Sequence, residues 1–313
     1  MTLHIPEFHT APYNEITRKA INLDDFSGRQ KMIRNLLYPY NRFLDIKDKI
    51  TEWHKPVGDL GDPEIGDLGL LLGDTGNGKS YMLKSFYKDA LKEPEGNRMR
   101  FPVIYIQVLS TYKGGSFAKA LLKATGKKLG SKRQNVDELG ECAIERMQEY
   151  ETVLIIIDDA HLLFTQKRYY EDHFGLLKGI VDAQFANLLL AGLPHLTKAV
   201  IGDRQIGRRC GFKVDVPVFD AAKEAMHYQA FLNGVDERLP FSKESGLAEP
   251  RNVERLFLAS EGSVGITMAI IKRAARLALT ARSACIMDHH IRSAIEDVAL
   301  ADKEALLMDE EAA

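Results

Sequence analysis

The stretch Gly73-Asp74-Thr75-Gly76-Asn77-Gly78-Lys79-Ser80 decides the fold, because it has the spacing G-x-x-x-x-G-K-[ST] of a phosphate-binding loop. A short apolar run, residues 68–72, precedes it, and residues 81–91 follow with apolar side chains close to helical spacing. In the order strand, loop, helix, backbone N–H groups and a helix N-terminus can surround a phosphate. The sequence therefore predicts a nucleotide-binding loop, and a glycine-rich turn that has this spacing by chance is the alternative.

Each part of this loop has an expected role. The glycines leave room for the backbone to wrap a phosphate, Lys79 is expected to reach the β and γ phosphates, and Ser80 is expected to ligate Mg²⁺. Lys79 is also a predicted catalytic residue. The predicted contacts to the nucleotide are Gly73, Asp74, Thr75, Gly76, Asn77, Gly78, Lys79, Ser80 and Tyr81.

Composition sets broad limits on the protein class. The chain has 313 residues, 45% of them hydrophobic and 27% charged, which is ordinary for a globular protein. A net charge of −2 means that nucleic-acid binding would need a local basic patch. The separated Cys142, Cys210 and Cys285 predict reduced thiols, not a disulfide framework or a zinc site. With neither a leader pattern nor a membrane-spanning run, we expect a cytoplasmic protein without a membrane partner.

The order of patterns along the chain predicts several regions. Residues 1–25 are polar and read as an N-terminal arm, and residues 26–220 alternate short apolar runs with helical patterns, as in an α/β nucleotide-binding domain. A helix is expected to begin near Ser116 and a last strand to cover residues 212–218. Helical patterns alone recur over residues 221–301, and residues 302–313 form an acidic tail. We therefore expect an α/β domain followed by a small all-helical domain.

Two carboxylates follow an almost wholly apolar run, residues 153–157. Such a run is typical of a central strand covered on both faces, and ligands of parallel sheets bind beyond the carboxyl ends of the strands. Asp158 is therefore predicted to hold Mg²⁺ through water, and Asp159 to activate the attacking water. The alternative is a strand that ends in two solvated acids before a turn.

Taken together, these patterns resemble an AAA+ ATPase with its lid, over about residues 27–300. Within that superfamily the chain is similar to the ATP-binding regulators of DNA transposition of the TniB, TnsC and MuB type. The motifs that support the resemblance are the loop of residues 73–80, Ile157-Asp158-Asp159-Ala160-His161-Leu162-Leu163, Ala191-Gly192-Leu193-Pro194, Asp203-Arg204-Gln205 before Arg208-Arg209, and Gly262-Ser263-Val264-Gly265.

The resemblance implies a P-loop AAA+ core with a five-stranded parallel sheet and a helical lid, ATP and Mg²⁺ as ligands, and a homo-oligomer in the form of a ring or a helical filament. It also implies that Arg208 or Arg209 reaches the nucleotide of a neighbouring subunit and stabilises charge on the γ phosphate. A basic loop before an edge strand is the alternative. Asp159 stands where the family usually has Glu, and Leu193 where a polar residue is expected, so slow turnover is predicted.

A basic segment without acidic residues lies between Ser110 and Val136. Such clusters bind phosphates without reading sequence, and the resemblance implies that this region faces double-stranded DNA. A solvated helix face is the alternative. The predicted DNA-binding residues are Thr111, Tyr112, Lys113, Lys119, Lys127, Lys128 and Arg133.

The resulting prediction is a DNA-binding ATPase, stimulated by DNA or a partner, that assembles on DNA with ATP, recruits or activates a transposase, and binds a target-selection protein. The alternatives that the sequence leaves open are a helicase loader or replication initiator, a small-molecule kinase, and a nucleotide-binding scaffold without turnover.

Overall fold

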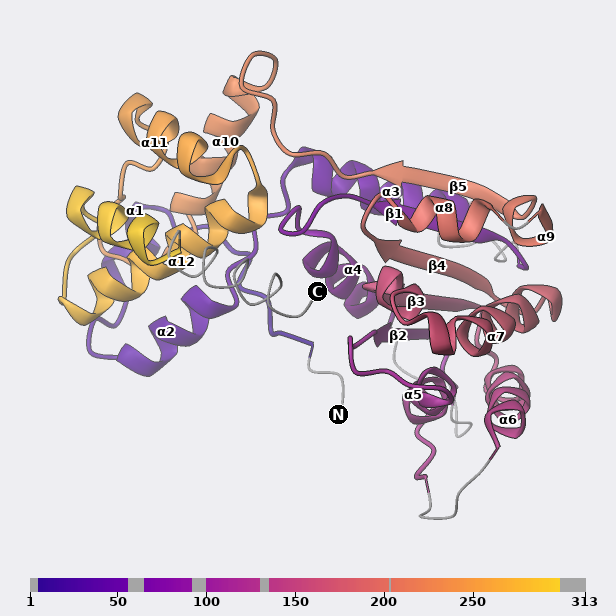
Figure 1. Cartoon of the computed structure of the whole chain (residues 1–313). Coiled ribbons are helices and arrows are strands. Elements are labelled where there is room, and N and C mark those ends of the chain that lie inside the picture. Colours follow the sequence, from indigo (N-terminus) through magenta and orange to yellow (C-terminus); the bar gives the residue numbers. More distant parts are fainter. Residues whose placement is uncertain (1–4, 56–64, 92–99, 130–134, 203, 299–313) are drawn as a thin grey trace. The chain divides into compact units, whose positions relative to one another are not determined.

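The computed structural model describes residues 5–55, 65–91, 100–129, 135–202 and 204–298, which form two compact units (Figure 1). The α/β unit is built from Arg42–Thr75 and Lys79–Pro217. The helical unit is built from Pro6–Asn41, Gly76–Gly78 and residues 218–298.

A five-stranded, all-parallel sheet forms the centre of the α/β unit, with the order β2-β3-β4-β1-β5. This confirms the predicted fold class. The strand ends are in register, because Leu72 pairs with both Gly192 and Asp215, and Gln107 pairs with Asp158. The carboxyl ends of the strands therefore meet at one edge of the sheet. The strands are β1 (Leu68–Leu72), β2 (Val103–Gln107), β3 (Leu154–Asp158), β4 (Asn187–Gly192) and β5 (Cys210–Asp215).

Side-chain burial explains this strand order. Every residue of β1, β3 and β4 is buried, as expected for runs of Leu and Ile covered on both faces, whereas β5 alternates between half-buried and exposed residues at the sheet edge. Parallel neighbours need crossover connections, and helices supply them. The helices of this unit are α3 (Asn41–His54), α4 (Lys79–Ala90), α5 (Ser116–Ala124), α6 (Val136–Glu149), α7 (Tyr170–Asp182), α8 (Leu196–Ile201) and α9 (Arg204–Gly207).

One strand differs in its bounds from the sequence prediction, and one predicted helix start is confirmed. The last strand begins earlier, at Cys210, and ends at Asp215. Helix α5 begins at Ser116, as predicted, and its N-cap is Gly115, whose φ of 73° favours glycine. The Ser116 hydroxyl accepts a hydrogen bond from the Lys113 amide, at 3.0 Å. Tight backbone geometry, which composition does not reveal, sets this helix start.

Helices and a cluster of aromatic rings make up the helical unit. Phe219, Tyr228 and Phe231 pack together, with ring centroids 5.3 to 6.2 Å apart. A last helical stretch covers residues 288–298. The named helices of this unit are α1 (Glu15–Lys19), α2 (Phe26–Arg34), α10 (Ala225–Asp236), α11 (Pro250–Ser260) and α12 (Val264–Thr280).

Residues near the N-terminus belong to this helical unit. The buried Arg18 donates to the Asp236 and Phe241 carbonyls at 3.0 and 3.2 Å, and the buried Arg29 donates to the Pro240 carbonyl at 2.9 Å. Residues 6–41 thus pack with the helices that follow residue 218. The predicted domain divisions after residues 25, 220 and 301 remain a proposal, and the acidic tail lies outside the described residues. In the described part of the chain, no helix is both long and apolar enough to cross a membrane.

Candidate nucleotide-binding site

The predicted phosphate-binding loop joins the carboxyl end of β1 to the start of α4. Gly76 and Gly78 each have a φ of 86°, a left-handed conformation that glycine adopts without steric cost. Helix α4 begins at Lys79, directly after these turns. The strand, loop and helix therefore follow one another as the sequence predicted, in the arrangement that presents backbone N–H groups to a phosphate.

Lys79 points back at its own loop. Its Nζ donates to the carbonyls of Gly73, at 2.6 Å, and Asp74, at 2.8 Å, and only 8% of the residue is exposed. Burial lowers the pKa of Lys79, and the nearby carboxylates of Asp158, Asp159 and Asp74 oppose that shift. The ammonium group is thus desolvated and held among carboxylates at the carboxyl edge of the sheet, where a phosphate would be strongly attracted to it.

Asp158 and Ser80, the two predicted magnesium ligands, are brought together. Asp158 is the last residue of β3 and is fully buried. Burial raises the pKa of Asp158, while hydrogen bonds from Tyr105 and Ser80 lower it. The Tyr105 hydroxyl donates to Asp158 Oδ2 at 2.5 Å. A buried carboxylate beside a hydroxyl is the donor set of a small oxygen-ligated cation such as Mg²⁺.

Asp159 adopts the left-handed conformation, with φ 56° and ψ 34°. Outside glycine this conformation is uncommon, although Asp tolerates it better than most residues, and it is frequent at functional sites. The Asp159 amide donates to Asp158 Oδ1 at 3.1 Å, and Gln107 Nε2 donates to Asp159 Oδ2 at 3.2 Å. The half-buried carboxylate is thereby oriented beside Asp158.

Sequence reasoning missed Tyr105 and Gln107. Both lie on β2, which pairs with β3 in a register that sets Gln107 opposite Asp158. The available signal was a polar group at these two positions within an otherwise apolar strand pattern. Pairing between β2 and β3 was needed to connect them with the two carboxylates.

The Ala191-Gly192-Leu193-Pro194 motif has a steric explanation at Gly192. A Cβ placed on Gly192 would lie 3.1 Å from His161 Nδ1, closer than most real contacts. Burial lowers the pKa of His161, and its ring stands edge-on to His195, with centroids 5.7 Å apart. Glycine at 192 therefore lets the segment after β3 pack against the end of β4.

Arg208 and Arg209 lie at the opposite, amino end of the sheet. The Arg209 carbonyl accepts from the Leu68 amide at 2.8 Å, at the start of β1, whereas the loop of residues 73–80 follows the other end of that strand. A strand of this length spans about 15 Å. Arg209 donates to the Val181 carbonyl at 2.6 Å and pairs with Asp182 at 3.4 Å, while Arg208 is exposed. Neither arginine is brought next to the loop of its own chain.

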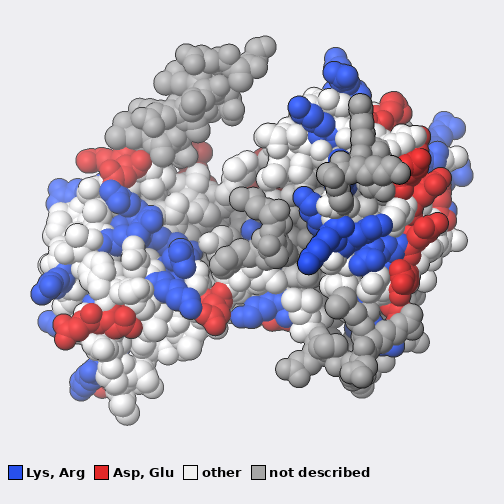
Figure 2. Space-filling model, turned by 90° about the horizontal axis from the view of Figure 1, so that it is seen from below, with Lys and Arg blue, Asp and Glu red and all other residues white. Residues whose placement is uncertain are grey.

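The predicted DNA-binding residues follow β2 and line α5. Thr111 and Lys113 are exposed, and Tyr112 is half-buried in the loop after β2. Lys119 lies on the side of α5 opposite the buried Phe117 and Leu121. Thr111, Tyr112 and Lys113 precede α5, and Lys127 and Lys128 follow it, so a helix about 14 Å long separates the two groups. Figure 2 shows basic side chains gathered on one part of the α/β unit, with acidic ones beside them.

One of the two lysines after α5 makes a contact within the chain. Lys128 is exposed, but Lys127 is half-buried and its Nζ donates to Cys142 Sγ on α6 at 2.8 Å. The Lys127 ammonium is therefore directed at α6. Arg133 lies outside the described residues.

Comparison with solved structures shows a shared fold. The chain is similar to the Aeropyrum pernix ORC1 protein in complex with DNA, with 15% identity, a TM-score of 0.61 and coverage of 82% of this chain and 64% of that one. For the Aeropyrum pernix ORC2 protein in ADPNP-ADP complexes, the identity is 16%, the TM-score is 0.55, and the match covers 82% of this chain and 66% of that one. For Drosophila ORC bound to DNA, the identity is 13%, the TM-score is 0.52, and the match covers 94% of this chain and 70% of that one. The chain thus spans less than two thirds of the length of either Aeropyrum protein.

Sequence comparison identifies the family. No functionally curated protein matches the chain. The family model of the bacterial TniB protein matches residues 59–216, just over half of the chain. The match covers the phosphate-binding loop, the Asp158-Asp159 pair and all five strands, the parts whose geometry is described above. The chain therefore belongs to the bacterial TniB family.

Proposed function

We propose that this protein is an ATP-dependent regulator of DNA transposition. In its ATP-bound state it assembles on double-stranded DNA without sequence preference and recruits or activates a transposase, and slow hydrolysis drives disassembly. The observation that carries the proposal is the meeting of Ser80 with Asp158 beside the buried Lys79, in a chain of the TniB family. That arrangement suits a nucleotide triphosphate with its cation.

The residues would divide the work of hydrolysis. Backbone N–H groups of residues 73–80 bind the phosphates, and Lys79 balances their charge. Ser80 and Asp158 would hold Mg²⁺, which supplies further positive charge next to the phosphates. Asp159 orients the attacking water and accepts its proton, with Gln107 fixing the carboxylate. Because Asp159 is one methylene shorter than Glu, we propose that the water is held less closely and that turnover is slow.

A neighbouring subunit would supply the arginine. Arg209 is engaged with α7 of its own chain, through Val181 and Asp182, while Arg208 is exposed and forms no ion pair within the described chain. We therefore propose that Arg208 contacts the γ phosphate of the next subunit and that Arg209 holds the loop that presents it. This arrangement makes hydrolysis depend on assembly.

DNA contact is proposed for Thr111, Lys113, Lys119 and Lys128, all of them exposed. ORC1 of Aeropyrum pernix and Drosophila ORC, which share the fold, were solved with DNA. Phosphate contacts from lysines are independent of sequence and weaken with salt. Lys127 is a weaker candidate, because its ammonium group contacts Cys142.

A second candidate function is replication initiation or helicase loading, which the fold likeness to origin-recognition proteins favours. The identity of 13 to 16% limits that likeness to the fold, whereas the family model favours transposition. Stimulation of strand transfer by a transposase encoded with this protein supports the first function. Loading of a replicative helicase, without that stimulation, supports the second.

Negative-stain imaging tests the assembly directly. The purified protein is mixed with a long duplex of arbitrary sequence, Mg²⁺ and either a non-hydrolysable ATP analogue or ADP. We expect rings or helical filaments on DNA only with the analogue. Arg208→Ala should remove them, and Arg209→Ala should lower the unfolding temperature but leave assembly intact below it. Isolated subunits with both nucleotides, or filaments that survive Arg208→Ala, would contradict the proposal.

A further inference from the structure

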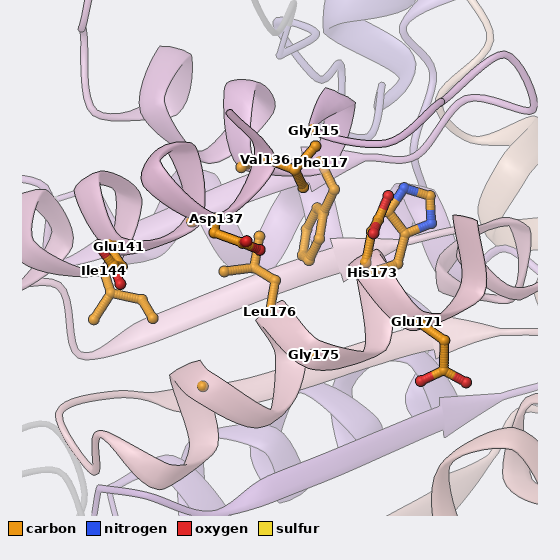
Figure 3. A pocket seen from close by; sticks show the side chains of 14 residues that line it. Gly115, Phe117, Val136, Asp137, Glu141, Ile144, Glu171, His173, Gly175 and Leu176 are labelled. Carbon is orange, nitrogen blue, oxygen red and sulfur yellow. The ribbon is translucent and has the colours of Figure 1, made fainter. Parts of the chain in front are cut away.

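A groove opens on the α/β unit where α6 passes α7, close to the start of α5. It encloses about 420 Å³, within the range of ligand pockets, and side chains from all three helices line it (Figure 3). We call it the α6–α7 groove and define it by six residues. They are Phe117, Val136, Asp137, Glu141, Ile144 and Leu176.

The floor of the α6–α7 groove is apolar. The Phe117 ring points into it in Figure 3, with Val136 and Leu176 close by and Ile144 farther along. Phe117 is 1% exposed and lies beneath this surface, so the half-buried side chains of Val136, Ile144 and Leu176 supply the apolar area that a partner can cover. An apolar surface of this kind gains free energy when a partner side chain covers it, at roughly 25 cal/mol per Å².

Two glycines of α7 shape the groove, one where the helices are close together and one where space is left between them. A Cβ on Gly179 would lie 3.3 Å from Ile144 Cδ1, so the two helices approach closely there. A Cβ on Gly175, which lines the groove and is exposed, would meet nothing within 4 Å. Glycine costs a helix about 1 kcal/mol relative to alanine, and no contact in the described structure requires it at 175. The missing side chain leaves space at the groove instead.

Exposed carboxylates surround this apolar floor. Asp137, Glu141, Glu171 and Asp172 all line the groove, and none forms an ion pair within the described part of the chain. The helix dipole accounts for acids in a first turn, such as Asp137. It does not account for Glu141, one turn later, which sits at i+4 from Asp137 and repels it. These carboxylates repel one another within the chain, and a cationic partner would relieve that repulsion.

Charge decides which class of ligand fits. Nucleic acid, nucleotides and anionic lipid would each be repelled by the carboxylates of the rim. An apolar floor and an acidic rim match a polypeptide that presents an apolar side chain between lysines or arginines. Of the predicted DNA contacts, Lys119 lies on the exposed side of α5, whereas Lys113 lies next to the groove, because its carbonyl is 3.3 Å from His173 Nε2. The acidic rim and the basic DNA contacts differ in the sign of their charge and would thus suit different partners.

We propose that the α6–α7 groove binds a peptide segment of another protein, with an apolar side chain on Val136, Ile144 and Leu176 and flanking cations paired with Asp137 and Glu141. This docking is independent of nucleotide and of assembly on DNA. It would let the protein hold a partner while its nucleotide state changes. The segment is recognised by this pattern of charge and apolarity and not by a fixed backbone structure.

Fluorescence anisotropy of a labelled peptide tests the proposal on the full chain without nucleotide. The probe is an octapeptide with two leucines, each flanked by lysines, and the controls replace the leucines by serine or the lysines by glutamate. We expect a Kd on the order of 100 µM for the probe and at least about tenfold weaker binding of both controls. Equal binding of the serine control would overturn the apolar part of the proposal.

Variants place the binding in the groove. Gly175→Leu adds a side chain at an exposed position whose Cβ meets nothing within 4 Å, and it favours the helix, so we expect a folded protein that binds the probe about tenfold more weakly. Glu141→Lys should weaken it by a similar factor. The matched control Glu145→Lys, an exposed position on α6 that does not line the groove, should stay within about twofold.

Three results would refute the docking site. Equal loss with Glu141→Lys and Glu145→Lys, or no loss with Gly175→Leu, would mean that the peptide binds elsewhere through general charge. A change in the sedimentation of the unliganded chain with Gly175→Leu would mean that the groove covers a second copy of this chain. Unchanged sedimentation is expected.

Discussion

The two ends of the parallel sheet differ in how their polar groups are satisfied. At the carboxyl end, burial raises the pKa of Asp158 and lowers the pKa of Lys79, so that it disfavours the charged form of each. Asp159 adopts a left-handed conformation there. At the amino end, Asp67 accepts from Trp53 Nε1 at 2.6 Å and from the Leu68 and Gly211 amides at 2.9 and 3.1 Å. The carboxyl end thus holds desolvated charges, whereas the carboxylate of Asp67 at the amino end is satisfied by hydrogen bonds within the chain.

This contrast indicates where the molecule is adapted for chemistry and where for stability. Desolvated charge destabilises a fold, but it strengthens interactions with a charged ligand. A network of hydrogen bonds that is satisfied within the chain gives a ligand nothing to bind and holds strands in register. Changes at the carboxyl end should therefore alter turnover more than stability, and changes at the amino end the reverse.

Lys79→Ala should give the largest effect. Removing the cation leaves charge on the phosphates uncompensated, so we expect ATP turnover to fall by about 10³-fold, or roughly 4 kcal/mol of activation free energy. The unfolding temperature should change little, because the desolvation cost of the ammonium group disappears together with its attraction to the nearby carboxylates. Phosphate release and thermal unfolding measure the two quantities. A large fall in unfolding temperature would show that Lys79 also supports the fold and would weaken the contrast.

His54 should make the amino end sensitive to acid. Its ring is buried, and its Nδ1 accepts from Asn187 Nδ2 at 3.1 Å. Burial lowers the pKa of His54 from 6.5 to about 4, so below pH 6.5 the unfolded chain binds a proton that the folded chain does not. The contribution of His54 to the free energy of unfolding is therefore fully present above about pH 6.5. It is lost as the pH falls toward 4, which lowers the free energy of unfolding by about 3 kcal/mol.

The free energy of unfolding measured by denaturant titration between about pH 4 and 7 checks this prediction. His54→Gln keeps an acceptor for Asn187 but cannot titrate, so its stability should depend less on pH. The difference between the two proteins is the informative quantity, because carboxyl groups also titrate in this range. Parallel curves for the two proteins would exclude His54 as the source.

Asp67→Asn should have a smaller effect, at the same end. An amide group would place a donor opposite Trp53 Nε1–H, so we expect a loss of about 2 kcal/mol of unfolding free energy. Trp53 is the single tryptophan of the chain, and its ring stacks on Phe212 with centroids 5.0 Å apart. Its fluorescence therefore reports on this end directly. Turnover by the folded fraction should be unchanged, and a slower rate would link the two ends.

The same contrast explains what the sequence could predict. The loop of residues 73–80 and the apolar run before Asp158 predicted a nucleotide-binding α/β unit, because short-range spacing and burial patterns carry that information, and the family was predicted from its resemblance over several motifs in combination. The spacing of residues along the sequence does not reveal which strands pair or in what register. Gln107 therefore became visible as a partner of Asp159 only through the register of β2 with β3.

Long-range packing also separated residues that look equivalent in the sequence. Arg208 and Arg209 are neighbours, yet Arg209 is engaged with the end of α7 and Arg208 is not. Likewise, Lys127 and Lys128 have the same side chain, but Lys127 alone is directed at Cys142. Which of two adjacent side chains is held depends on segments distant in sequence, so composition could not decide it.

Asp159→Glu should give the smallest effect and the sharpest test of the slow-turnover hypothesis. The extra methylene brings the carboxylate nearer to the attacking water, and we expect turnover to rise by about threefold. Glu tolerates the left-handed conformation of residue 159 less well than Asp, so unfolding free energy should fall by about 0.5 kcal/mol. Asp159→Asn, which removes the base at nearly constant shape, should instead lower turnover by at least about tenfold.

Opposite signs of rate and stability in Asp159→Glu would mean that the carboxyl end gains catalysis by accepting strain, as the contrast between the two ends of the sheet requires. A slower Asp159→Glu enzyme would instead mean that the local backbone, held by the Asp159 amide and by Gln107, is adapted to the shorter side chain. Slow turnover would then arise from the position of the attacking water relative to the neighbouring subunit's arginine, and Arg208→Lys, which keeps the charge but not the planar fork, would be the variant that measures it.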